Sequence, residues 1–180
     1  MFRNIPTGVA AVLVSFWAVG LGMPMSARAD TEVRFVAPQH FADQEFKRSA
    51  SRAEAIAVFE RFLVELGDRY VRKGQSLVIE VLDVQLAGDY ASWWSVMNDV
   101  RVLTDATPPR LNLHYTLREN GQILAEARES ITDANYLTNP AARASVDPYI
   151  HEKVLLESWF RKRFAAPRAN GAAPRIGRAS

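Results

Sequence analysis

The sequence predicts an α+β fold, in which an antiparallel sheet of about four strands carries two amphipathic helices on one face. Apolar residues recur at steps of three and four within 51–73 and again within 147–164, as they do on one face of a helix. Between these segments lie runs that alternate polar with apolar residues or are rich in β-branched residues, which is typical of strands. The chain has 180 residues, 48% hydrophobic and 23% charged, which suits a globular domain better than a disordered chain.

Two segments predict the helices. Ser51-Arg52-Ala53-Glu54 matches a capping box, so the first helix is expected to begin there and to end near Gly74. Asp147 is the expected N-cap of the second helix and Pro148 its first residue, and basic residues at 161–163 suit its C-terminal end. The apolar stripes comprise Ile56, Phe59, Leu63, Leu66 and Tyr70 in the first helix and Ile150, Val154, Leu155, Leu156, Trp159, Phe160 and Phe164 in the second.

Residues 32–37 alternate charged with apolar side chains and end at a proline, which favours an edge strand. Residues 76–87 are almost continuously apolar, as expected of a central strand. Their apolar positions switch from odd to even at Leu82-Asp83, which predicts a β-bulge. A further short strand is expected around residues 100–103.

Residues 111–117 and 122–132 predict a hairpin around Asn120-Gly121. A two-residue turn would set Tyr115 opposite Glu126, whereas a three-residue loop over 119–121 sets Tyr115 opposite Ala125. Because a slip of one residue reverses every side chain, the matching apolar faces favour the three-residue loop, with Gly121 in the left-handed conformation.

The first 29 residues have the pattern of a secretory signal peptide. Arg3 precedes an apolar run over residues 9–23, and Ala27-x-Ala29 matches the small-residue cleavage motif, so cleavage is predicted between Ala29 and Asp30. The alternative, an uncleaved membrane anchor, is disfavoured because a membrane span needs roughly 20 apolar residues, more than the run over residues 9–23 provides. The protein is therefore expected to be periplasmic or secreted and not embedded in the membrane.

This processing changes the net charge of +2. Residues 1–29 carry two arginines and no acid, so the mature chain is neutral. Residues 167–180 carry three more arginines and no acid, and are predicted to be a disordered basic tail. The predicted single α+β domain, residues 30–166, then has 17 basic and 20 acidic residues, which disfavours binding to nucleic acid because that needs clustered positive charge.

The motifs of common enzymes are absent, and no catalytic residue, cofactor or metal is predicted. The chain has no cysteine, which excludes disulfides and thiol nucleophiles, and it has no phosphate-binding loop and no His-Glu-x-x-His. His40 with Asp43 and Glu45 offers metal-ligand chemistry, but a solvated loop is the favoured interpretation. His114 is expected on the polar face of the sheet, and His151 on the surface.

Two groups of side chains are candidates for function. Asp83 and Asp89 flank the end of the second strand, and Asp99 and Asp105 follow; two carboxyl groups facing one cleft about 5–10 Å apart could hydrolyse a glycosidic bond. The other group is a possible partner or ligand surface of exposed aromatic and polar residues. Its members are Trp93, Trp94, Asp133, Asn135 and Tyr136, with Tyr90 near the two tryptophans.

Several segments, taken in order, resemble the domain of unknown function 3016 family of exported bacterial proteins. The resemblance covers about residues 31–164 and implies an exported, single-domain protein; it implies no activity and no catalytic residue. The segments are Val33-Arg34-Phe35-Val36, Leu82-Asp83-Val84-Gln85-Leu86-Ala87-Gly88, Asp99-Val100-Arg101-Val102, Pro108-Pro109-Arg110, Thr132-Asp133-Ala134-Asn135-Tyr136, Glu152-Lys153 and Trp159-Phe160-Arg161.

Three functions stay open. The favoured one is a non-enzymatic module that binds an unknown envelope protein or polymer. The second is a hydrolase of an envelope polymer that uses Asp83, Asp89 or Asp99. The third is a small-ligand carrier, which needs a cavity of roughly 300 Å³ or more between helices and sheet.

Overall fold

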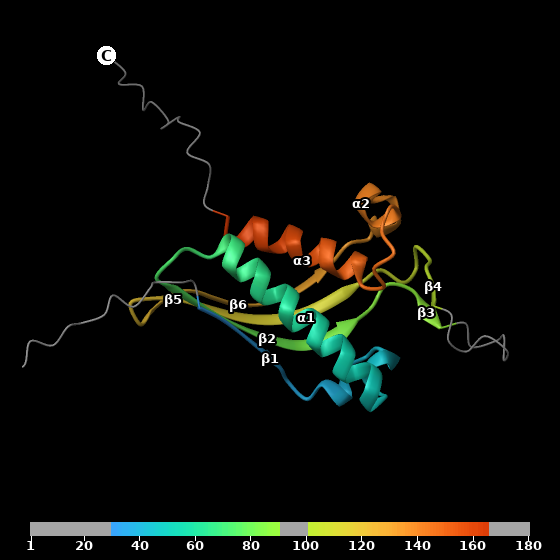
Figure 1. Cartoon of the computed structure of the whole chain (residues 1–180), viewed down its shortest axis with the longest axis horizontal. Helices are drawn as coiled ribbons and strands as arrows, with labels where there is room; N and C mark the ends of the chain where they lie inside the picture. The colour runs from blue at the N-terminus through green and yellow to red at the C-terminus, as the bar shows by residue number, and fades with distance from the viewer. Residues whose placement is uncertain (1–29, 91–100, 166–180) are drawn as a thin grey trace, which may run out of the picture.

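The computed structural model describes residues 30–90 and 101–165. A four-stranded sheet in the order β1-β2-β5-β6 forms one layer, and α1 and α3 lie across one face of it (Figure 1). The strands of this sheet are β1 (Asp30–Phe35), β2 (Gln75–Gln85), β5 (Arg110–Glu119) and β6 (Gln122–Thr132). The helices are α1 (Ser49–Tyr70), α2 (Pro140–Arg143) and α3 (Ile150–Arg163), with short 3₁₀ turns η1 (Pro38–His40), η2 (Gln44–Phe46) and η3 (Tyr136–Thr138).

The α+β class, the four strands and the placement of both long helices on one face are confirmed. The sheet is mixed rather than purely antiparallel, because β1 runs parallel to β2. The reason is the order of elements: α1 carries the chain back along the sheet between the two strands, and a helix between two neighbouring strands makes them parallel. β1 is an edge strand, as predicted, and β2 is central.

The core fills the space between the sheet and the helices. Leu77, Ile79 and Val81 of β2 alternate toward the helices, and each is at most 1% exposed. Tyr115 of β5 makes edge-to-face contacts with Trp159 and Phe164, with ring centroids 5.6 and 5.4 Å apart. The predicted bulge is confirmed: the β2–β5 register shifts between Val81 and Asp83.

The predicted hairpin loop is wrong in length. Glu119 pairs with Gln122, so the turn has two residues, and both Asn120 and Gly121 have positive φ, at 51° and 80°. This is the geometry that favours Asn-Gly in a tight hairpin turn. The predicted left-handed Gly121 is confirmed.

A bulge in β6 resolves the conflict of faces that seemed to exclude the two-residue turn. Arg118 pairs with Ile123 but Leu117 pairs with Ala125, so Leu124 is an extra residue in β6. Beyond it, Tyr115 faces Ala127 rather than the predicted Ala125, and the apolar faces match again.

Both predicted helix starts are also corrected. α1 begins at Ser49, and the Ser51 hydroxyl donates to the carbonyl of Glu45 at 2.8 Å instead of capping the helix. α3 begins at Ile150 rather than at Pro148. The Asp147 carboxylate accepts the N–H of Tyr149 at 2.9 Å, so it stabilises the turn that leads into α3.

The short strand expected around residues 100–103 is present. β4 (Arg101–Val102) pairs with β3 (Asp89–Tyr90) in a separate two-stranded sheet. The predicted signal peptide and basic tail lie outside the described residues. In the ranges that the structure describes, no helix is both long enough and apolar enough to cross a bilayer.

Candidate functional site

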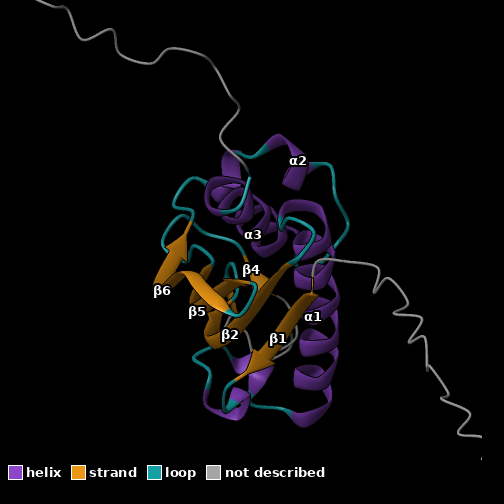
Figure 2. Cartoon of the chain, turned by 90° about the vertical axis from the view of Figure 1, so that its left-hand side faces the viewer, coloured by secondary structure: helices purple, strands orange, loops and turns teal. Residues whose placement is uncertain are grey.

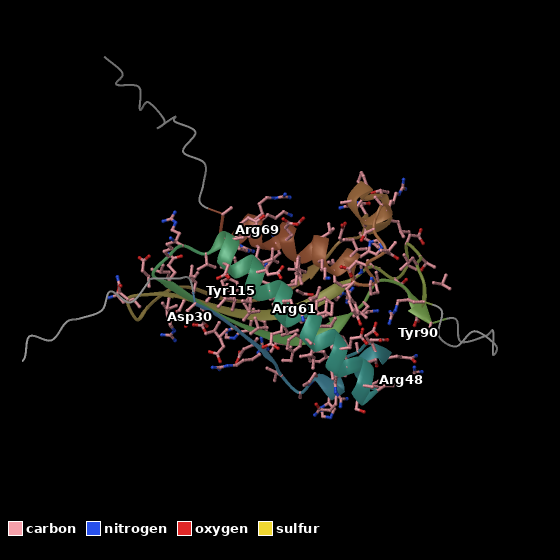
Figure 3. All side chains as sticks on the ribbon, viewed as in Figure 1. Asp30, Arg48, Arg61, Arg69, Tyr90 and Tyr115 are labelled. Carbon is pink, nitrogen blue, oxygen red and sulfur yellow. The ribbon has the colours of Figure 1, made fainter. Side chains whose placement is uncertain are left out.

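A half-open cleft of about 540 Å³ lies between the β3–β4 pair and the segment that joins α2 to α3. We call it the Tyr149 cleft. Figure 1 shows β3, β4 and α2 at the same end of the molecule, and in Figure 3 Tyr90 marks this end, opposite Asp30. The lining residues come from the end of β2 (Leu86, Ala87), from the small sheet (Tyr90, Arg101, Leu103) and from the chain between α2 and α3 (Ala142, Arg143, Ser145, Val146, Asp147, Pro148, Tyr149), with Glu45, Leu137, Ile150 and His151.

Large apolar side chains are exposed around this cleft. Leu103 is 43% exposed and Val146 fully exposed, and both line it. Val102, next to Leu103, is 46% exposed. Exposed apolar side chains that gather at a hollow mark a surface suited to a partner or a ligand, whereas single ones need no explanation.

A hydrogen-bonded cluster supports the small-sheet wall of the cleft. The Arg101 guanidinium donates to both carboxylate oxygens of Asp43, at 2.8 and 3.0 Å, and to the carbonyl of Gly88 at 3.1 Å. It also stacks 4.6 Å from the centre of the Tyr90 ring. The Tyr90 hydroxyl donates to Glu45, and burial, reinforced by this hydrogen bond, raises the Tyr90 pKa. The wall is therefore fixed before any partner arrives.

Glu152 of α3 is a buried carboxyl group behind the cleft. Glu152 is only 1% exposed. Its Oε1 accepts the N–H of Ala87, which lines the cleft, at 2.6 Å. Oε2 has no hydrogen-bond partner among the described residues. Burial raises the pKa of Glu152 to about 7.

The sequence carried a signal for this burial. Glu152 shares the helical spacing of Leu155, Leu156 and Trp159, so it falls on the apolar stripe of α3 rather than on its solvent face. The neighbouring residue His151, predicted on the surface, is half-buried: its ring lies edge-on to Tyr136 at 4.8 Å, and burial lowers its pKa.

The residues considered as metal ligands have other partners. Asp43 binds Arg101, Glu45 accepts the Tyr90 hydroxyl, and His40 is exposed at the end of η1. Across residues 30–90 and 101–165, no three His, Asp or Glu side chains converge as a metal site would require.

Among the described carboxylates proposed for hydrolysis, Asp83 and Asp89 do not line the Tyr149 cleft. Asp83, in the β2 bulge, accepts the N–H of Ala42 at 2.7 Å, and Asp89 accepts the N–H of Tyr90 at 2.8 Å. Asp105 is exposed, and Asp99 lies outside the described residues.

The predicted partner surface is divided by the structure. Trp93 and Trp94 lie outside the described residues. The Asp133 carboxylate accepts the N–H of the exposed Asn135 at 2.9 Å, a local turn of the kind common for these residue types. Tyr136, expected at an exposed surface, is instead buried at 1% exposure because its ring packs against His151. Its hydroxyl donates to the Thr104 carbonyl at 2.7 Å.

Of three comparisons with known proteins, one assigns the chain to a family. A family model described as "Protein of unknown function (DUF3016)" matches residues 29–162. The search of curated proteins finds no match. A solved minor lipoprotein from Acinetobacter baumannii is similar at 9% identity and a TM-score of 0.23, over 76% of this chain and 88% of that one. A TM-score this low carries no argument about fold or function.

Proposed function

Since the chain belongs to the DUF3016 family of proteins of unknown function, we propose its function from its geometry: it is an exported, non-enzymatic module that binds a component of the cell envelope in the Tyr149 cleft. The observation that carries this proposal is the cleft itself, about 540 Å³ in volume and flanked by the exposed side chains of Leu103 and Val146. Ligand pockets in proteins span about 300–1,000 Å³ and are lined mainly by apolar groups.

The chemistry of the lining favours an apolar or amphipathic segment over a strongly charged ligand. Arg101 is neutralised by Asp43, and Asp147 is paired with Lys153 at 2.5 Å. The Arg143 Nε donates to the carbonyl of Leu137 at 3.0 Å. Arg101 and Asp147, already in ion pairs, contribute little to a new partner, and Arg143 is held by a backbone carbonyl, so contact with Leu103, Val146 and Pro148 supplies most of the affinity.

The other two functions receive less support. A small-ligand carrier would need a cavity between the helices and the sheet. Core side chains fill that space instead: Leu63, Leu66 and Ile79 are all 0% exposed. A hydrolase needs two free carboxylates facing one cleft, whereas Asp83 and Asp89 each accept a backbone N–H.

Site-directed photocrosslinking in cells tests the proposal. A photoreactive amino acid replaces Val146 or Leu103 at the cleft, and Arg61, exposed in the middle of α1, as the matched control. We expect both cleft positions to crosslink to the same envelope component and Arg61 not to. The substitution Val146→Glu in the Leu103-labelled protein should reduce that crosslink. Equal labelling from Arg61, or no crosslink from either cleft position, contradicts the proposal.

We also propose that Trp93 and Trp94 contact the same partner. They belong to the segment between Tyr90 and Arg101, and both of these residues line the cleft. A Trp93→Ala, Trp94→Ala double variant should then reduce the crosslink from Val146. An unchanged crosslink would remove the two tryptophans from the proposal and leave the cleft in it.

A further inference from the structure

β6 is a long edge strand of the sheet. It pairs with β5 on one side, and no described strand lies on the other, as Figure 2 shows at the rim of the sheet. The strand is eleven residues long, against six for β1 at the opposite edge. An edge strand offers unpaired N–H and C=O groups, which proteins usually protect with proline, charged side chains, β-bulges or short length. β6 has a bulge at Leu124 and charged residues at 126, 128 and 129, but it contains no proline, and Ile123 and Leu124 are each 50% exposed.

We propose that β6 pairs with β6 of a second copy of the chain, antiparallel about a two-fold axis through Ala127. An axis perpendicular to the sheet keeps the helices of both copies on the same side of the joined sheet. The polar faces of the two copies then form one surface, and their apolar faces form the other. The result is one continuous eight-stranded sheet, an isologous interface of the kind common in homodimers. This inference does not depend on the Tyr149 cleft, which lies at the end of the strands rather than along their edge.

The charges of β6 select this register. With the axis at Ala127, Glu126 of each copy faces Arg128 of the other, which makes two opposite-charge pairs on the polar face. Both side chains are exposed in the single chain, and Arg128 has no ion pair with any described residue. Moving the axis by one residue sets Glu126 against Glu126, or Arg128 against Arg128. Like charges directly opposite each other destabilise a sheet, whereas opposite charges stabilise it.

The shape of the strand agrees with the charges. The bulge at Leu124 leaves residues 125–132 for regular pairing, and the five residues centred on Ala127 lie within this stretch. Ala127 then faces its own copy, and its small side chain leaves room at the axis. Ala125 faces Glu129, which is held in place by Trp159 at 3.0 Å and by Arg163 at 2.9 Å.

Charge reversal tests the register in the purified full chain by sedimentation equilibrium. Glu126→Arg or Arg128→Glu alone sets like charges together and should weaken the dimer by about tenfold or more; the double reversal should restore it. Glu80→Arg is the matched control, since Glu80 and Glu126 both bind His114, at 2.8 and 3.1 Å, but Glu80 lies on β2 away from the edge. Circular dichroism checks that each variant is folded.

A second measurement uses the absence of cysteine in the chain. Directly opposite residues in an antiparallel pair have Cα atoms about 4.5–5.5 Å apart, which a disulfide can bridge. Ala127→Cys should therefore form a disulfide-linked dimer under mild oxidation, and Ser130→Cys on the same strand should not. A monomer at all concentrations, equal linkage through both cysteines, or a dimer insensitive to single charge reversal overturns the proposal.

Discussion

The guanidinium of Arg101 and the carboxylate of Asp43 form a two-pronged ion pair, Nη2 to Oδ1 at 2.8 Å and Nη1 to Oδ2 at 3.0 Å. The Asp43 side chain is 5% exposed and that of Arg101 19%. The same carboxylate accepts the N–H of Leu86 at 3.0 Å and that of Glu45 at 2.9 Å. One carboxyl group thus joins the segment after β1, the end of β2 and β4.

Removing this carboxylate should be strongly destabilising. Asp43→Ala leaves a largely buried guanidinium and two backbone N–H groups without their acceptor, so we expect the free energy of unfolding to fall by about 3–5 kcal/mol. Urea denaturation measures the loss. The control is Arg34→Ala, which breaks an exposed ion pair with Glu32 and should leave the stability almost unchanged. Similar small losses in both variants would show that the Asp43 cluster does not hold the three segments together.

The buried Glu152 should make stability fall as pH rises. Burial raises its pKa from 4.5 to about 7, so near pH 6 the folded chain holds a proton that the unfolded chain has released. Stability is therefore highest below about pH 4.5 with respect to this group and is lost as pH rises through about 7. A shift of this size corresponds to a loss on the order of 3 kcal/mol.

Glu152→Gln isolates the contribution of this group, because an amide oxygen still accepts the N–H of Ala87 and has no proton to lose. The difference in unfolding free energy between wild type and variant should grow in favour of the variant from about pH 4.5 to about pH 7 and then level off. The comparison is needed because the hydrogen bond that His114 donates to Glu80 raises the pKa of His114, whose contribution also declines as pH rises. A pH-independent difference would contradict the assignment.

Much of the fold was predictable because its determinants are local. Helical periodicity placed α1 and α3, and the switch of apolar positions at Leu82-Asp83 placed the β2 bulge. The parallel pairing of β1 was missed because alternation specifies which residues face the core and not which strand lies alongside. The hairpin loop was missed because a two-residue turn plus a bulge gives the same match of faces as a three-residue loop, and face matching alone cannot separate the two.

The cleft was harder to predict than the fold. Its walls come from segments distant in sequence: the Arg101 wall is held by Asp43, 58 residues away, and Glu152 binds Ala87, 65 residues away. Such contacts form only when the sheet and helices pack together, so local sequence patterns do not predict them. Glu152 is the exception, because its place on the apolar stripe of α3 was visible in the spacing.

Gly67 of α1 should resist substitution even by the best helix former. Glycine to alanine in a helix normally gains about 1 kcal/mol. A Cβ on Gly67, however, would lie 2.0 Å from Oγ1 and 2.7 Å from Cγ2 of Thr31, where α1 crosses β1. We therefore expect Gly67→Ala to destabilise the protein by about 1–3 kcal/mol.

Thermal and urea unfolding of a double-mutant cycle check this contact. Thr31→Ala removes Oγ1 and Cγ2 but keeps Cβ, which is also 2.7 Å away, so the second substitution should recover only part of the loss. The reverse change at an exposed position of the same helix, Ala57→Gly, should cost about 1 kcal/mol and report the intrinsic propensity alone. A stabilising Gly67→Ala would mean that α1 and β1 are not in close contact here.

The proposed export predicts a defined mature end. β1 begins at Asp30, and Thr31 pairs with Leu77, so cleavage after Ala29 leaves the whole strand in the mature chain. N-terminal sequencing of protein recovered from the periplasm should read Asp30-Thr31-Glu32. Ala29→Arg should retain the precursor because signal peptidase requires a small residue there. Arg28→Ala, next to the site, is the control and should be processed normally; recovery of unprocessed wild-type chain from the cytoplasm would contradict export.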